Sequence, residues 1–166
     1  MKTIPYKTSV PGHLSDEFAH GFKRMSIERL VGKLTNTVYL WHADGTGLQV
    51  QSEMHDIIDW LEVGSLCFSH VSGAVSSASG SGYCEIVVSE INLPDEFGAG
   101  LKASKLVLST HGIAIESGVV IKGAGGNEII LVAGAGPHTV AIKAPSVVEA
   151  FDPEYPLSEY SREPIE

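Results

Sequence analysis

Two side chains of metal-binding type lie four residues apart in a segment with helical periodicity. His55 and Asp59 would share one face of a helix over residues 53–63. A zinc or iron site needs at least one further ligand, which His42 or His70 on adjoining strands would supply. The alternative is a solvated helix face with a local hydrogen bond, since no His-Glu-x-x-His motif accompanies the pair. A metal site on His55, Asp59 and His42 therefore stands as one hypothesis.

The other common catalytic arrangements are incomplete. The Gly-Ser-Gly triplet at 80–82 lies in a Gly/Ser-rich loop and not in a nucleophile elbow. Cys67 and His70 are three residues apart, so on a strand they point to opposite faces. The glycines of 123–126 sit in a predicted hairpin turn and do not open a helix, as a dinucleotide fingerprint requires. Paired carboxylates for glycoside chemistry stay open, because no two acids stand out. The sequence leans against an enzyme and indicates no cofactor.

A predicted strand face carries aromatic and amide side chains typical of an interface. Tyr39 and Trp41 alternate with core residues, and Gln49 and Gln51 lie beside them on the neighbouring strand. Exposed aromatic rings bury a large area at low entropic cost when a partner docks. These four residues form the candidate binding surface, unless another part of the chain, such as the aromatic C-terminal segment, covers the face.

A β-hairpin followed by a helix is the predicted framework for these residues. Apolar and polar side chains alternate at 38–41 and at 48–51, as in half-buried strands. A three-residue turn at 43–45, with Gly45 in the left-handed conformation, keeps the apolar side chains on one face. The expected cross-strand pairs are Leu40 with Leu48 and Val38 with Val50.

The segment after this hairpin has the pattern of an amphipathic helix. Ser52 fits an N-cap, Gly64 fits a stop, and apolar residues recur at three- and four-residue spacing from Met54 to Leu61. We expect the packed helix of the fold at residues 53–63. A weaker helical turn is expected at 14–22, with Ser15 as its cap.

The second half of the chain is predicted to be an antiparallel meander. Short apolar segments alternate with glycine turns, including one at Gly118; the expected strands are 105–109, 113–116, 119–122, 129–132 and 139–143. Adding 81 to the numbering maps the first hairpin onto 119–131, with Gly45 on Gly126. The second copy is apolar on both faces, so we expect it to be central and the first copy peripheral. Duplication and the ordinary similarity of hairpins both account for this echo.

The remaining segments are predicted to surround one domain over 1–166. Residues 1–12 should form an irregular surface arm, and 72–82 a flexible Gly/Ser loop. Cys67 and Cys84 are expected to be reduced core residues. Residues 149–166 carry six acids and one base among recurring aromatic side chains. This acidic aromatic arm should lie extended across the body, anchored by its rings.

Charge excludes some classes of partner. The 20 acids and 11 bases give a formal charge of -9, and no basic cluster is longer than Lys23-Arg24. Nucleic acids and anionic membranes are therefore unexpected, whereas a basic protein partner is electrostatically favoured. The first residues lack the apolar run of a signal peptide, so we expect a cytoplasmic protein.

Two short stretches carry a resemblance to other proteins. The chain resembles small uncharacterised bacterial proteins, which have no known activity to carry over, at Ser52-Glu53-Met54-His55-Asp56 and at Phe151-x-Pro153-Glu154-Tyr155-Pro156-Leu157-x-x-Tyr160. By size and charge alone the chain is also similar to immunity proteins that neutralise toxins. We expect a β-dominated α+β domain, an antiparallel sandwich or partly open barrel with one packed helix. Its expected function is non-enzymatic binding in the bacterial cytoplasm, with a small-molecule or metal site as the alternative.

Overall fold

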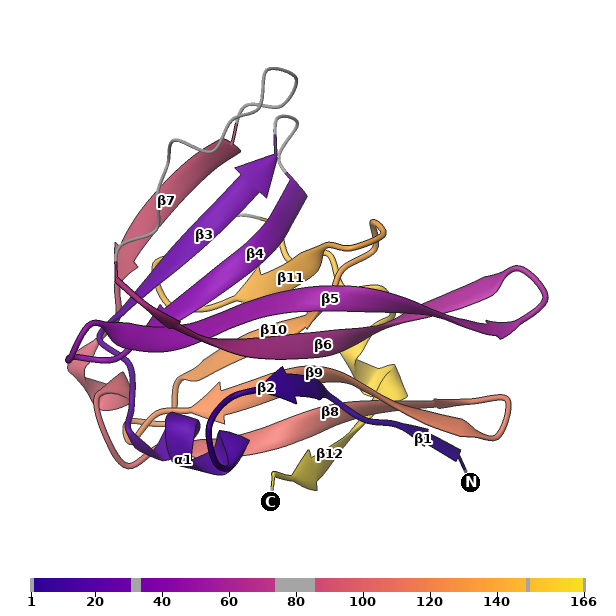
Figure 1. Ribbon diagram of the computed structural model, residues 1–166, viewed down its shortest axis with the longest axis horizontal. Coiled ribbons are helices and arrows are strands. Elements are labelled where there is room, and N and C mark those ends of the chain that lie inside the picture. The colour runs from indigo at the N-terminus through magenta and orange to yellow at the C-terminus, as the bar shows by residue number, and fades with distance from the viewer. Residues whose placement is uncertain (1, 31–33, 74–85, 149, 166) are drawn as a thin grey trace.

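The computed structural model describes residues 2–30, 34–73, 86–148 and 150–165, and shows two sheets packed as an open sandwich (Figure 1). Pairing within the sheets is antiparallel except for two short N-terminal strands. The predicted β-dominated α+β class is confirmed. Within the described residues, no helix is both long and apolar enough to span a bilayer.

The N-terminal sheet has six strands in the order β2-β6-β5-β4-β3-β7. Strands β3 to β6 form a meander, and β7 returns to pair with β3 at the edge. The bounds are β2 Lys7–Ser9, β3 Arg24–Leu30, β4 Leu34–Trp41, β5 Thr46–Ile58, β6 Leu61–Ser72 and β7 Ile86–Asn92.

The C-terminal sheet repeats this connectivity with the order β11-β10-β9-β8-β12. Its meander runs from β8 to β11, as the sequence predicts, and β12 returns to pair with β8. Strand β1 adds to the far end of β9. The bounds are β1 Lys2–Ile4, β8 Lys102–Thr110, β9 Ile113–Lys122, β10 Glu128–Ala133, β11 Val140–Lys143 and β12 Tyr160–Pro164.

The two echoed hairpins share register and turn geometry. The predicted pairs Val38↔Val50 and Leu40↔Leu48 form in β4–β5, and their counterparts Val119↔Leu131 and Ile121↔Ile129 form in β9–β10. Both turns are closed by a 2.8 Å backbone bond, from His42 N to Thr46 O and from Gly123 N to Asn127 O. Gly45 and Gly126 take φ values of +88° and +94°. The register and the Gly45 turn are confirmed in both copies.

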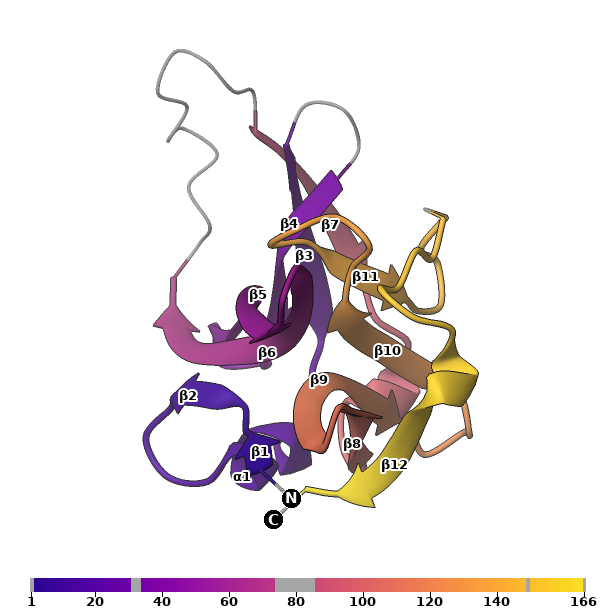
Figure 2. The ribbon, with the colours of Figure 1, turned by 90° about the vertical axis from the view of Figure 1, so that its right-hand side faces the viewer.

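The core lies where these hairpins face each other across the sandwich (Figure 2). All eight paired side chains are 0% exposed, so each hairpin supplies one wall of the core. The β9–β10 hairpin is also buried on its other face, at Val120 and Ile130, as expected. The expectation that β4–β5 is peripheral is wrong, because β3 and β6 flank it on both sides.

The helix predicted at residues 53–63 is wrong. This segment is the far end of a long hairpin, in which β5 and β6 pair from Thr46↔Ser72 to Ile58↔Leu61. The spacing of apolar residues fitted a helix, but a twelve-residue partner strand overrides that weak local preference. Gly64 is no helix stop: an added Cβ there would lie 2.6 Å from the Ala133 Cβ, so glycine lets β6 approach β10.

The break predicted at Gly118 is also wrong, because β9 runs without interruption from Ile113 to Lys122. The register between β8 and β9 shifts at Leu106/Val107, opposite this glycine. An added Cβ on Gly118 would lie 2.8 Å from the Leu131 carbonyl oxygen. Glycine here permits close packing within the sheet and does not form a turn.

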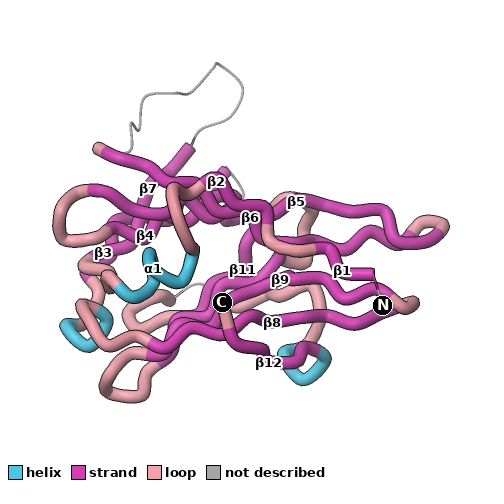
Figure 3. The backbone as a smooth tube through the Cα atoms, turned by 60° about the horizontal axis from the view of Figure 1, so that its bottom comes forward, coloured by secondary structure: helices cyan, strands magenta, loops and turns pink. Residues whose placement is uncertain are grey.

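The N-terminal arm is not irregular, because it contributes β1 to one sheet and β2 to the other (Figure 3). Between these strands, Glu116 accepts a 2.8 Å bond from the Tyr6 N–H and pairs with Lys105 at 2.5 Å. The arm is followed by α1 (Leu14–Ala19), the α-helix of the described residues; its N-cap is His13 and not Ser15.

The C-terminal segment lies extended across the C-terminal sheet, as predicted. Phe151 and Tyr155 pack against a second apolar cluster, and Tyr160 is buried. Glu154 accepts a 2.9 Å bond from the Gly64 N–H, and burial raises the pKa of this carboxyl group. The predicted 72–82 loop, beyond residue 73, and Cys84 lie outside the described residues.

Replacing Gly64 with alanine tests the close approach of the two sheets. The new methyl group overlaps the Ala133 side chain, so we expect Gly64→Ala to lower the free energy of unfolding by about 1–3 kcal/mol. Urea denaturation measures this loss. Adding Ala133→Gly removes the overlapping methyl group and should restore part of the stability; a double variant no better than the sum of the single variants would contradict the contact.

Candidate functional site

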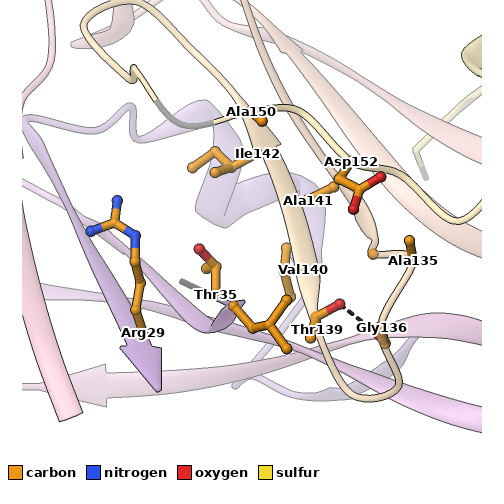
Figure 4. Close-up of a pocket in the computed structure, with 12 residues that line it drawn as sticks. Arg29, Thr35, Ala135, Gly136, Thr139, Val140, Ala141, Ile142, Ala150 and Asp152 are labelled. Carbon is orange, nitrogen blue, oxygen red and sulfur yellow. Dashed lines mark hydrogen bonds between the residues drawn. The ribbon is translucent and has the colours of Figure 1, made fainter. Parts of the chain in front are cut away.

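A cleft of about 400 Å³ opens between the sheets, where β3 and β4 diverge from the edge strand β11 (Figure 4). Its residues come from three segments far apart in the chain, at 29–35, 134–142 and 150–152. The size lies within the range of small-molecule sites in proteins. The cleft is the best candidate for a functional site.

The floor of the cleft is mostly apolar. Val140 and Ile142 on β11 are nearly buried, and Leu34 on β4 faces them while remaining about half exposed. Buried apolar side chains at such a floor favour an apolar ligand surface, because its transfer from water is favourable. A bound ligand would therefore cover the exposed part of the Leu34 side chain, which forms one wall of the cleft.

The loop that joins β10 to β11 is built by local hydrogen bonds. The Gly134 N–H donates to the Thr139 carbonyl at 2.8 Å, and the Thr139 hydroxyl donates to the Gly136 carbonyl at 2.6 Å. The Ala135 N–H donates to the Asp152 carbonyl at 3.0 Å, which fixes the C-terminal segment to this loop. One wall of the cleft is thus preorganised before any ligand binds.

Two charged side chains stand on opposite sides of the cleft. Figure 4 shows Arg29 on β3 at one side and Asp152 at the other, with β11 between them. Arg29 donates from Nη1 to the Ser89 hydroxyl at 2.8 Å. The Asp152 carboxylate is exposed and has no partner within the described part of the chain. Asp152 is therefore available to a positively charged group at the mouth of the cleft.

A second hollow of about 340 Å³ adjoins the cleft and shares Leu34 and Thr139 with it. Two buried polar atoms on its wall, Asn36 Oδ1 and Ser52 Oγ, have no hydrogen-bond partner among the residues that the structure describes. Both residues continue the inner face of β4–β5 beyond Val38 and Val50. The inner face therefore changes from apolar core to polar lining at this end of the sandwich.

The residues of the metal hypothesis are not brought together. His42 precedes β5, whereas His55 lies nine residues beyond the start of that strand, a separation of roughly 30 Å. Asp59 occupies the β5–β6 turn with φ +50°. No three His, Cys, Asp or Glu side chains of the described ranges form a group able to hold a metal ion. The expected helical neighbourhood of His55 and Asp59 is absent because the segment is a hairpin.

Each of the two histidines instead has a local hydrogen bond. His55 Nε2 lies 2.7 Å from the Ser65 hydroxyl on β6. His42 is buried, with Nδ1 2.7 Å from the Gly21 carbonyl and Nε2 2.7 Å from Glu17. Because the carbonyl oxygen only accepts, Nδ1 carries a proton. His42 thus ties α1 and the segment after it to the end of β4.

The predicted aromatic surface is covered by its own sheet. Trp41 is only 1% exposed: its indole N–H donates to Ser26 at 2.8 Å, and the Arg24 guanidinium lies 4.8 Å from its ring centre. Tyr39 stacks on it at 5.7 Å and is half-buried. The exposed Trp41 that an interface needs is therefore not present.

The amide residues of the same predicted surface remain more accessible. Gln51 is exposed and donates to the Thr37 hydroxyl at 3.0 Å. Gln49 is half-buried beside Tyr39. Gln51 also borders the hollow, so this edge is the part of the predicted surface that adjoins the candidate site.

Cys67 is a free thiol and a poor nucleophile. Burial raises its pKa to about 11, and the adjacent Glu53 carboxylate adds to the rise. A thiol acts as a nucleophile through its thiolate, which is scarce at neutral pH with such a pKa. Cys67 therefore has a structural role on β6.

The cleft is the feature that sequence reasoning missed. Leu34, Val140 and Ile142 follow ordinary strand patterns, and their meeting depends on how the sheets diverge. A usable signal was Asn36, a polar residue that interrupts the apolar inner face of β4.

The chain matches no family model, no curated protein and no solved structure. Functional inference accordingly depends on the geometry of the site.

Two serines allow a matched test of the hollow. The buried Ser52 hydroxyl has no partner in the described ranges, so Ser52→Ala should raise the free energy of unfolding by about 1 kcal/mol. Ser65 is equally buried but bonded to His55, so Ser65→Ala should lower it by about 1 kcal/mol. Urea denaturation of both variants measures the difference. An equal loss in both would show that the Ser52 hydroxyl is satisfied.

The raised pKa of Cys67 predicts slow alkylation. In a Cys84→Ala background at pH 8, we expect iodoacetamide to react roughly a hundredfold more slowly than with free cysteine. Glu53→Gln removes the neighbouring negative charge, so the pKa falls and the reaction accelerates. Mass spectrometry follows the reaction, and a rate near that of free cysteine would contradict the assigned environment.

Proposed function

We propose that this protein is a non-enzymatic binding protein whose cleft takes a small, mostly apolar ligand with a positive charge. The observation that carries the proposal is the cleft of about 400 Å³, with an apolar floor and the unpartnered Asp152 carboxylate at its mouth. Such sites combine apolar burial, which supplies affinity, with a few polar groups that orient the ligand.

Charge favours a cationic group on the Asp152 side of the cleft, because Arg29 on the opposite side already donates to Ser89. The Asp152 carboxylate attracts an ammonium group, and the formal charge of -9 on the whole chain favours approach of cations. An exposed ion pair contributes about 0.2–1 kcal/mol, so the apolar floor supplies most of the affinity. The charge of Asp152 therefore determines which of several ligands of similar shape binds most tightly.

The polar groups of the cleft suit binding better than catalysis. The Thr139 hydroxyl is engaged with the Gly136 carbonyl, which leaves it poorly placed as a nucleophile. The residues that line the cleft in the described chain include no histidine or cysteine to serve as base or nucleophile. Binding without chemistry is the simpler use of this arrangement.

Three probes of similar shape test the proposal: phenethylamine, phenethyl alcohol and 3-phenylpropionate. In ¹⁵N-labelled protein, we expect phenethylamine to shift amide signals of residues 134–142 and to leave those of 57–62 unchanged. It should bind about two- to fivefold more tightly than the alcohol, and the acid more weakly than both. NMR titration at low salt measures the three affinities.

Two variants provide the controls. Asp152→Asn should abolish the advantage of the amine over the alcohol while leaving alcohol binding unchanged. Ala135→Trp places a large side chain at the exposed mouth of the cleft, so it should weaken all three probes without unfolding the protein. Probe shifts that persist in Ala135→Trp, or that map outside the cleft, would reject the proposal.

A protein partner is the second candidate function. The specific observation in its favour is the side chain of Trp60, which is 100% exposed. It replaces the covered Trp41 as the aromatic residue available to a partner.

A further inference from the structure

Trp60 lies at the tip of the long β5–β6 hairpin, defined here as the β5–β6 tip (residues 56–62). Its side chain is 100% exposed, and that of the neighbouring Ile58 is 49% exposed. The hairpin extends to the right-hand end of the molecule in Figures 1 and 3, away from the diverging ends of β3 and β4. The tip therefore projects from one end of the sandwich (Figure 1).

The exposed side chains are held on a rigid base. Ile57 and Leu61, which belong to the same tip, are partly buried against the apolar cluster that contains Val63. Phe151 and Tyr155 of the C-terminal segment pack on this cluster too. These contacts hold the backbone of the tip, which reduces the conformational entropy lost there on binding, while the Trp60 side chain stays fully exposed to solvent.

Full exposure of the Trp60 side chain has a free-energy cost that folding does not offset. A fully exposed tryptophan leaves its whole apolar surface in water, and the adjacent Ile58 enlarges the apolar surface. Tryptophan is among the residues most enriched at the energetic centres of protein interfaces. Because the Trp60 side chain is fully exposed, it adds little to the stability of the fold. Docking of a partner is the natural explanation for its position.

Acidic residues surround this apolar centre. Asp56, Asp59 and Glu62 are exposed, and none has an ion-pair partner within the described part of the chain. An anionic membrane would be repelled by these charges, whereas a basic surface would be attracted. An apolar centre within a polar rim is the usual anatomy of a protein interface.

We propose that the β5–β6 tip docks into a concave apolar socket on a basic protein partner, with Trp60 as the anchor. Ile58 contacts the wall of the socket, and the acids face lysine or arginine side chains at its rim. The tip and the cleft use different side chains, although the C-terminal segment contacts both, through Phe151 and Tyr155 under the tip and through Asp152 at the cleft.

A phage-displayed library of random 12-residue peptides closed by a disulfide is the probe. Selection on the wild-type protein should enrich sequences that combine apolar residues with lysine or arginine. Trp60→Ala should reduce binding of these peptides at least about tenfold, consistent with the loss of an interface anchor. Asp56→Lys should reduce it less, and added salt should shrink that smaller effect.

The controls separate docking from folding. Trp60→Ala should leave the Tm unchanged, because the side chain is fully exposed. Val148 is 93% exposed elsewhere on the molecule, so Val148→Ala should leave peptide binding unchanged. Selected peptides that bind Trp60→Ala as well as wild type, or an absence of enrichment, would overturn the proposal. A dimer by sedimentation that depends on Trp60 would assign the tip to a second copy and also overturn it.

Discussion

Eight apolar side chains, four from the β4–β5 hairpin and four from the β9–β10 hairpin, meet face to face and are completely removed from water. At roughly 1.5–3 kcal/mol for each buried valine, leucine or isoleucine, this contact is a main source of the stability of the sandwich. It also determines where the sheets separate. Beyond Val38 and Val50 the inner face becomes polar at Asn36 and Ser52, and there the sheets open into the cleft and the adjoining hollow.

The two sheets share more than one hairpin. Each has a four-stranded meander whose fifth strand returns to pair with the first, and each central hairpin has the same register and left-handed glycine turn. Duplication and the ordinary similarity of β-meanders both account for this shared connectivity. The halves differ at their ends: one extends β5–β6 into a long tip with an exposed tryptophan, and the other ends in the short edge strand that lines the cleft. The two proposed binding regions lie where the two halves differ.

Sequence reasoning predicted the structure correctly where a local pattern is compatible with only one arrangement of the backbone. Alternation at 38–41 and the glycine at 45 admit one register, so the first hairpin and its echo were predictable. Residues 53–63 satisfied helical spacing equally well, and the turn at Asp59 contains no glycine to reveal it. Gly64, taken for a helix stop, is explained only by the distant Ala133. The cleft was unpredictable for the same reason, because it joins three distant segments.

A crystal structure of the protein soaked with phenethylamine would locate the bound probe directly. We expect the probe to be ordered in the cleft, with its aromatic ring against the apolar floor that includes Val140. A cleft that is empty in the soaked crystal, with the probe ordered elsewhere on the molecule, would contradict the claim that this cleft is the binding site.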